Sequence, residues 1–178
     1  MIDDFIKAAG VARGTFYNHF ASTEELLDAA SKMLEDNVMR WTLAAVGEIN
    51  DPALRFATGV RLWLRWSQAD KVGCGFVVRS RFRGPLVERQ LAADLKDGLD
   101  SGKFSFTSVQ VARDLSIGTI LEAMRRLMTS RVPKTYTDDV ARVILQGVGA
   151  DKRTADRLMA APLPPIKLPV WGPEAAQV

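Results

Sequence analysis

Proline and glycine divide this sequence into segments of helix length, and no other feature constrains the fold as much. The breaks fall at Gly10, 20–22, 50–52, 73–75, 84–85, 101–102, 132–133 and 147–151. Between these breaks almost no segment shows the strict alternation of apolar and polar residues that a half-buried strand requires. The sequence therefore predicts an all-helical (all-α) protein of eight or nine helices.

Composition limits the classes of protein that fit. The 178 residues are 47% hydrophobic, which is sufficient for a buried core. Cys74 is the only cysteine, so an internal disulfide is excluded, and no Cys/His spacing typical of zinc is present. No run approaches the roughly 18 apolar residues that span a bilayer, and the first residues, MIDDFIK, carry acids where a signal peptide is basic. We expect a cytoplasmic protein with no membrane partner, no metal site and no cofactor.

The first twenty residues contain two short amphipathic segments joined by a tight turn. Apolar residues at 2, 5, 6 and 9 mark one face of a short helix, and Gly10 follows where a helix end commonly needs a positive φ. A second helix is predicted over 12–20, with Phe16 and Phe20 facing the first helix. Its outer face is small, polar and rich in hydrogen-bond donors: Arg13, Gly14, Thr15, Tyr17, Asn18 and His19. Such a face suits the major groove of DNA, because it can contact both phosphates and base edges.

A capping box follows these two helices. Ser22 is the predicted N-cap and Glu25 stands at the third helical position, so the sequence predicts a long helix over about 23–46. The first-turn amides of this helix can also face a phosphate.

Residues 8–27, AAGVARGTFYNHFASTEELL, strongly resemble the second and third helices and the start of the fourth helix of TetR-family repressors. The resemblance is close over 1–34 and limited to the helix pattern beyond. It implies that Arg13, Thr15 and Asn18 reach bases or nearby phosphates, and that Tyr17 and His19 contact the DNA backbone. Thr23 stands where the family often has a lysine that contacts a phosphate, and we include it in the predicted DNA-binding set with Gly14.

The same resemblance predicts that the DNA-binding unit is incomplete. The family has a further helix before the segment that starts at Ile2, packed on the side of Phe5, Val11 and Phe16, and this sequence is expected to lack it. Residues 1–34 also carry three basic and five acidic side chains, an unusual balance for a surface that binds DNA.

The resemblance implies that the longer second part holds an effector pocket and dimerises through its last two long helices, near 108–130 and 135–149. Gly118 and Thr119, among larger apolar residues, would allow two helices to approach closely. The predicted dimer interface consists of Leu115, Gly118, Thr119, Glu122, Val140, Val143 and Ile144. The expected organisation is an incomplete head with its linking helix at 1–46, a regulatory and dimerisation domain at 47–161, and a proline-rich tail at 162–178.

Six residues of this second part are candidates to line a pocket for a small apolar or aromatic effector: Trp41, Trp63, Trp66, Cys74, Phe76 and Met124. Core packing is the favoured alternative, because aromatic residues at helical spacing, such as Trp63 and Trp66, usually pack in the interior. Cys74 is likewise more typical of a small buried hydrophobe than of a reactive thiol.

The sequence gives no support to catalysis. His19 is the only histidine, and no serine, cysteine or carboxylate near it forms a nucleophile and base pair. We therefore expect no enzyme. The favoured function is a ligand-responsive transcriptional regulator, a repressor, that binds palindromic operator DNA as a homodimer. The alternative is a truncated TetR-like helical module that binds ligands or partners without binding DNA.

Overall fold

The structure, a computed structural model, describes residues 2–80 and 84–165, and within them it contains nine helices and no strand. The helices are α1 (Ile2–Ala9), α2 (Arg13–His19), α3 (Thr23–Val46), α4 (Pro52–Ala69), α5 (Lys71–Ser80), α6 (Pro85–Asp100), α7 (Val109–Thr129), α8 (Tyr136–Gly147) and α9 (Lys152–Ala160). The all-helical prediction is confirmed. Of the predicted tail, 162–165 have no regular structure and the remainder lies outside the described residues.

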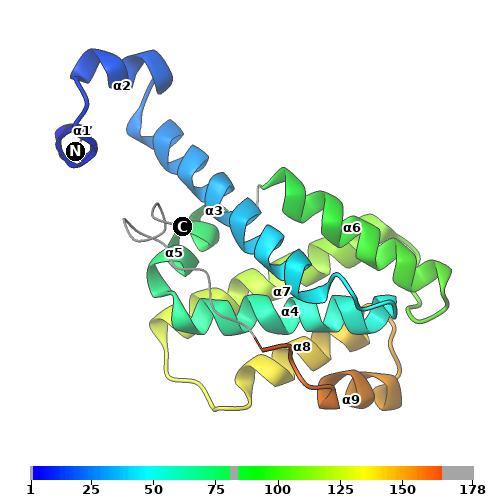
Figure 1. Ribbon diagram of the computed structural model, residues 1–178. Helices are drawn as coiled ribbons and strands as arrows, with labels where there is room; N and C mark the ends of the chain where they lie inside the picture. Colours follow the sequence, from blue (N-terminus) through cyan, green and yellow to red (C-terminus); the bar gives the residue numbers. More distant parts are fainter. Residues whose placement is uncertain (1, 81–83, 166–178) are drawn as a thin grey trace.

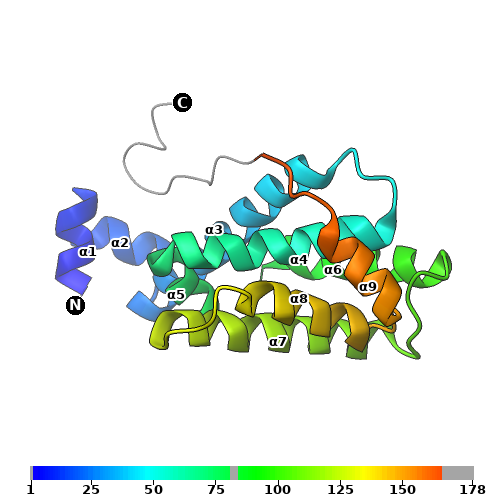
Figure 2. The ribbon, with the colours of Figure 1, turned by 90° about the horizontal axis from the view of Figure 1, so that it is seen from below.

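The long helix α3 joins two parts of different shape. Residues 2–22, here called the head, stand apart from the helical bundle formed by the remaining helices (Figure 1). Helix α3 extends from the head into the bundle, where it packs against α4, α5 and α6. On another face of the bundle, α7 and α8 lie side by side (Figure 2).

Helix α4 is the centre of the bundle. It packs against α3, α5, α6, α7, α8 and α9, and it is apolar on most of its circumference, as a buried helix is expected to be. Trp63 and Trp66 are both buried and meet edge to face with ring centroids 5.8 Å apart. Phe56, near the start of α4, meets Phe104 of the loop between α6 and α7 edge to face as well, with ring centroids 5.3 Å apart.

Four helices begin at a side chain that accepts hydrogen bonds from first-turn amides, which otherwise have no partner within the helix. These N-caps are Ser22 for α3, Asp51 for α4, Ser108 for α7 and Asp151 for α9. Pro52 follows Asp51 at the first position of α4, where the missing N–H costs nothing. Because these local signals are strong, the predicted helix over 23–46 has the same bounds in the structure.

Two glycines bring the α6–α7 loop against the bundle. A Cβ atom on Gly98 would lie 2.2 Å from the Phe104 ring, so only glycine permits the present packing of that ring. Gly149 has a φ of +86°, and a Cβ there would lie 2.1 Å from the backbone oxygen of Ser105. The Ser105 amide donates to the Val148 carbonyl at 3.1 Å, which fastens the loop to the end of α8.

None of the described helices is both long and apolar enough to cross a membrane. Across residues 2–80 and 84–165, no group of three or more His, Cys, Asp or Glu side chains is arranged to hold a metal ion.

The packing of Phe104 predicts the effect of a methyl group at Gly98. Gly98→Ala should lower the free energy of unfolding by about 1–3 kcal/mol, because the buried ring must move to admit it. Gly59→Ala is the matched control: it also lies inside a helix, but its Cβ would meet Thr42 at an ordinary 3.7 Å. The control should be neutral or stabilising by up to about 1 kcal/mol. Urea unfolding of both variants measures this, and equal stabilities would contradict the packing account.

Candidate DNA-binding head and ligand pocket

Aromatic side chains of the head pack against one another along α2 and at its C-terminal end. Phe16 is buried, and its ring lies 5.5 Å from that of Tyr17 and 5.7 Å from that of Phe20. Helix α1 packs on α2 but has no buried residue. Phe5 and Val11 remain 37% and 38% exposed, so the head keeps apolar surface in contact with solvent.

The outer face of α2 presents the polar residues that the sequence predicts for it. Arg13, Gly14, Thr15, Tyr17, Asn18 and His19 are all exposed, and Thr23 at the start of α3 is half-buried. The Arg13 guanidinium lies 3.7 Å from the carboxylate of Asp3, an exposed ion pair that is worth little and leaves the side chain able to move. The face is therefore accessible and free of strong internal contacts that would have to break before it contacted another molecule.

The capping box fixes how the head enters α3. The Ser22 hydroxyl accepts a hydrogen bond from the Glu25 amide at 3.2 Å. The Glu25 carboxylate in turn accepts from the Ala21 amide at 2.6 Å, one residue before the Ser22 amide that the motif predicts. Two otherwise unpaired amides are thus satisfied at the junction, and the direction of α2 relative to α3 is set locally.

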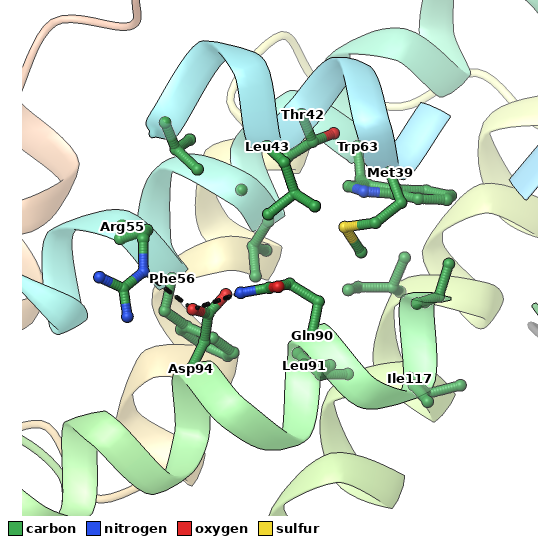
Figure 3. Close-up of a pocket in the computed structure, with 15 residues that line it drawn as sticks. Met39, Thr42, Leu43, Arg55, Phe56, Trp63, Gln90, Leu91, Asp94 and Ile117 are labelled. Carbon is green, nitrogen blue, oxygen red and sulfur yellow. Dashed lines mark hydrogen bonds and ion pairs between the residues drawn. The ribbon is translucent and has the colours of Figure 1, made fainter. Parts of the chain in front are cut away.

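A mainly apolar pocket opens between α3, α4, α6 and α7 (Figure 3). It encloses about 540 Å³ of space between side chains, part of which is open to solvent. Its apolar wall consists of Met39, Leu43, Val46, Phe56, Gly59, Val60, Trp63, Val87, Leu91, Ile117 and Ile120, and its polar residues are Thr42, Arg55, Gln90 and Asp94. This composition is that of a site for a small organic molecule, with few polar groups to orient it.

The polar end of the pocket is organised around Asp94 of α6. Its Oδ1 atom accepts hydrogen bonds from Nε of Arg55 at 2.9 Å and from the side-chain amide of Gln90 at 3.1 Å (Figure 3). Burial raises the pKa of Asp94, and the bonds from Arg55 act in the opposite direction. The hydrogen bond with Asp94 raises the pKa of Arg55, which keeps the guanidinium charged beside the carboxylate.

Models of one protein family match both parts of the chain. The model for bacterial regulatory proteins of the tetR family matches residues 2–30. The model for the tetracyclin repressor-like C-terminal domain matches residues 51–160, more than half of the chain. The chain belongs to the TetR family. The first match begins at residue 2, so it gives no support to the prediction that the TetR-type head lacks its first helix.

Solved structures show the same fold over nearly the whole chain. The structure of RolR in complex with the ligand resorcinol has a TM-score of 0.78 and 23% sequence identity, and the match covers 94% of this chain and 86% of RolR. RolR without ligand has a TM-score of 0.75 and 25% identity, with 94% and 89% covered. No curated protein matches the sequence.

Of the six residues predicted to line an effector site in this TetR-family chain, only Trp63 lines the pocket between α3 and α6. Trp66, Cys74 and Met124 are fully buried in the core, and Trp41 and Phe76 are half-buried against it. Burial raises the pKa of the Cys74 thiol to about 11, and its Sγ donates to the Met124 carbonyl at 3.8 Å. At these positions the structure has core packing, the alternative that the helical spacing of the aromatic residues favours.

Sequence reasoning missed the polar end of the pocket, although α6 carries a signal for it. Val87, Leu91, Leu95 and Gly98 form an apolar stripe at helical spacing, and Asp94 lies in that stripe. An acidic residue on the buried face of a helix needs a partner. Asp94 is therefore the residue that an inspection of helical faces could have identified, whereas its partner Arg55 lies 39 positions earlier on another helix.

Six of the seven residues predicted for the TetR-type dimer interface reach the surface of the chain, and one does not. Leu115, Gly118, Glu122 and Val143 are exposed on α7 and α8, and Thr119 and Val140 are half-buried. Ile144 is fully buried within the chain, so it supports this face from below instead of forming its surface. A Cβ at Gly118 would meet no atom within 4 Å, which leaves room for another helix to approach closely.

Proposed function

We propose that this chain is a ligand-responsive transcriptional repressor that acts in the cytoplasm and binds palindromic operator DNA as a homodimer. One observation carries the proposal: a single helix, α3, bears the head at its N-terminal end and a wall of the pocket at its C-terminal end. A molecule that enters the pocket therefore contacts the same rigid element that positions the head.

The polar face of α2 supports the DNA-binding step. The face is exposed, and because Gly14 has no side chain, the first turn of α2 is narrow enough to enter the major groove. Arg13 and Asn18 have side chains that pair with base edges, and Tyr17 and His19 can donate to phosphates. We include Thr15 and Thr23 in this contact surface.

The exposed face of α7 and α8 supports a homodimer. Leu115 and Val143 are 38% and 58% exposed, and Val111 of α7 adds a further apolar side chain at 65%. Exposed apolar side chains on the same helices as a glycine with open space above it are typical of a helix-to-helix interface. A two-fold dimer through this face would present two heads to half-sites about one DNA turn apart.

The pocket supports a small aromatic effector. Phe56 and Trp63 provide flat aromatic surfaces in its apolar wall, against which a small ring can lie. RolR, which shares the fold, binds resorcinol in its solved complex, and resorcinol is a small aromatic compound. We propose a ligand of this general size, bound between α3 and α6.

Two carboxylates link the pocket to the direction of α3. Glu35 accepts a hydrogen bond from the Gly84 amide at 2.6 Å, and the adjacent Asp36 accepts from the Leu86 amide at 3.3 Å. Gly84 and Leu86 belong to the N-terminus of α6, whose unpaired amides attract carboxylates. Helix α3 is therefore attached to α6 one turn before Met39 enters the pocket, and a ligand that separates the two helices beyond this attachment would tilt α3 about it.

The DNA-binding proposal is tested by Tyr17→Ala and Asn18→Ala. Each should weaken binding to operator DNA by roughly ten- to hundredfold, the size expected for the loss of a specific contact worth about 1–3 kcal/mol. Fluorescence anisotropy with the DNA upstream of the gene, at two salt concentrations and against an unrelated duplex, measures the effect. Thr107→Ala, an exposed site in the α6–α7 loop away from the head, is the control.

Unchanged affinity in both variants would remove Tyr17 and Asn18 from the interface. A folded parent chain that binds neither duplex would favour the alternative function, a TetR-like helical module that binds ligands or partners but not DNA.

The attachment between α3 and α6 is tested by Asp36→Ala. Coupling between effector and operator is typically about 5- to 150-fold in affinity. The ratio of operator affinity without effector to operator affinity with effector should fall severalfold in the variant. Its affinity for the effector should stay within about twofold of the parent's, because Asp36 does not line the pocket. Glu88→Ala removes a different, exposed carboxylate from the first turn of α6 and should leave the ratio unchanged. An Asp36→Ala protein with the parent's ratio would contradict this route of coupling.

A further inference from the structure

Arg55, the positively charged residue at the polar end of the pocket, is already hydrogen-bonded to other groups of the protein. The Arg55 guanidinium donates from Nε to Asp94 at 2.9 Å, from one terminal nitrogen to Asp97 at 2.6 Å and from the other to the Ile49 carbonyl at 3.5 Å. Its charge is thus matched by two carboxylates, and the three side chains together carry a net charge of −1 when ionised. This end of the pocket does not offer a free positive charge to an anionic ligand.

The acceptors at the same end are only partly used. Both side-chain hydrogen bonds to Asp94 reach Oδ1, and among the described residues no donor reaches Oδ2. Gln90 donates its amide to Asp94, which leaves its carbonyl oxygen as a second acceptor beside the pocket. The hydroxyl of Thr42, the remaining polar side chain of the lining, donates to the Val38 carbonyl at 2.8 Å. Oδ2 of Asp94 and the Gln90 carbonyl oxygen are therefore the acceptors that this end of the lining can offer to a ligand.

The apolar wall decides which donors are suitable. An anion in this surrounding would lose its hydration without a free counter-charge, at a large cost. A neutral hydroxyl loses much less hydration, and its bond to a carboxylate is charge-assisted and stronger than one between neutral groups. An ammonium ion would also have to give up its hydration, and it would share Asp94 with Arg55, which already pairs with that carboxylate at 2.9 Å.

We infer that the pocket selects a neutral aromatic compound with a hydroxyl group, which donates to Oδ2 of Asp94 while the ring lies against the apolar wall. Carboxylate analogues of the same shape are rejected, and Asp94 is the residue that determines this specificity. The inference rests on the proposed effector role of the pocket and specifies the chemistry that it recognises.

Three ligands of matched shape test the inference: 4-methylphenol, 4-methylanisole and 4-methylbenzoate. Their affinities for the full chain are measured by isothermal titration calorimetry at pH 7, where the phenol is neutral and the benzoate is ionised. We expect the phenol to bind roughly tenfold or more tightly than the other two, because only it can donate to a carboxylate. Asp94→Asn should reduce the phenol-to-anisole ratio to about twofold or less, and it should raise the affinity for the benzoate because Arg55 loses a counter-charge.

Asp97→Asn is the matched control. It removes the other carboxylate that pairs with Arg55, but Asp97 does not line the pocket, so the phenol-to-anisole ratio should stay near that of the parent. Circular dichroism confirms that each variant is folded. If Asp94→Asn fails to fold, the three affinities of the parent chain still decide whether hydroxyl donors are preferred.

Three outcomes would overturn the inference: a benzoate that binds the parent as tightly as the phenol, a phenol that does not bind the folded parent, or an Asp94→Asn protein with the parent's phenol-to-anisole ratio. Operator binding is measured separately without ligand. A chain that prefers the phenol but does not bind operator DNA would contradict the proposed function alone, and a chain that binds operator DNA without this preference would contradict the inference alone.

Discussion

Glu35 is fully buried in the middle of α3, and a buried carboxylate is costly unless hydrogen-bond donors surround it. The start of α6 has the opposite need, because its first amides have no partners within the helix. The bond from the Gly84 amide to Glu35 at 2.6 Å meets both needs at once. The position of α6 relative to α3, and with it the shape of the pocket between them, depends on this contact.

The same arrangement supports the proposed action of the helical bundle on a separate head. The pocket walls on α4 and α7 belong to the interior of the bundle, where α4 packs against six other helices. The walls on α3 and α6 are nearer its edge, and α3 alone continues to the head (Figure 1). Displacement by a ligand is therefore easiest on the side that carries the head, because close-packed interiors resist deformation.

The sequence predicts the local features of this structure well and the tertiary ones poorly. The capping box at Ser22 and the other breaks at proline and glycine set helix ends through contacts within a few residues, and these appear in the structure. The predicted break at 73–75 is wrong: α5 runs through it from Lys71 to Ser80, and α4 ends earlier, with Asp70 as its C-cap. The pocket depends on which faces of distant helices meet. Trp66 and Cys74 face the core, whereas Asp94 and Arg55 meet across 39 positions of sequence. Periodicity can indicate that a helical face is buried, but it does not indicate which helix covers it.

The central claim is that a ligand between α3 and α6 redirects the head relative to the bundle. It is tested most directly by a distance measurement between spin labels at Lys7→Cys in the head and Lys152→Cys at the start of α9, both exposed sites. Cys74 is buried with its pKa raised to about 11, so it should escape labelling. With the labelled chain diluted into unlabelled protein, saturating 4-methylphenol should shift the distance distribution by several ångströms. An unchanged distribution in a chain that has demonstrably bound the ligand would contradict the account.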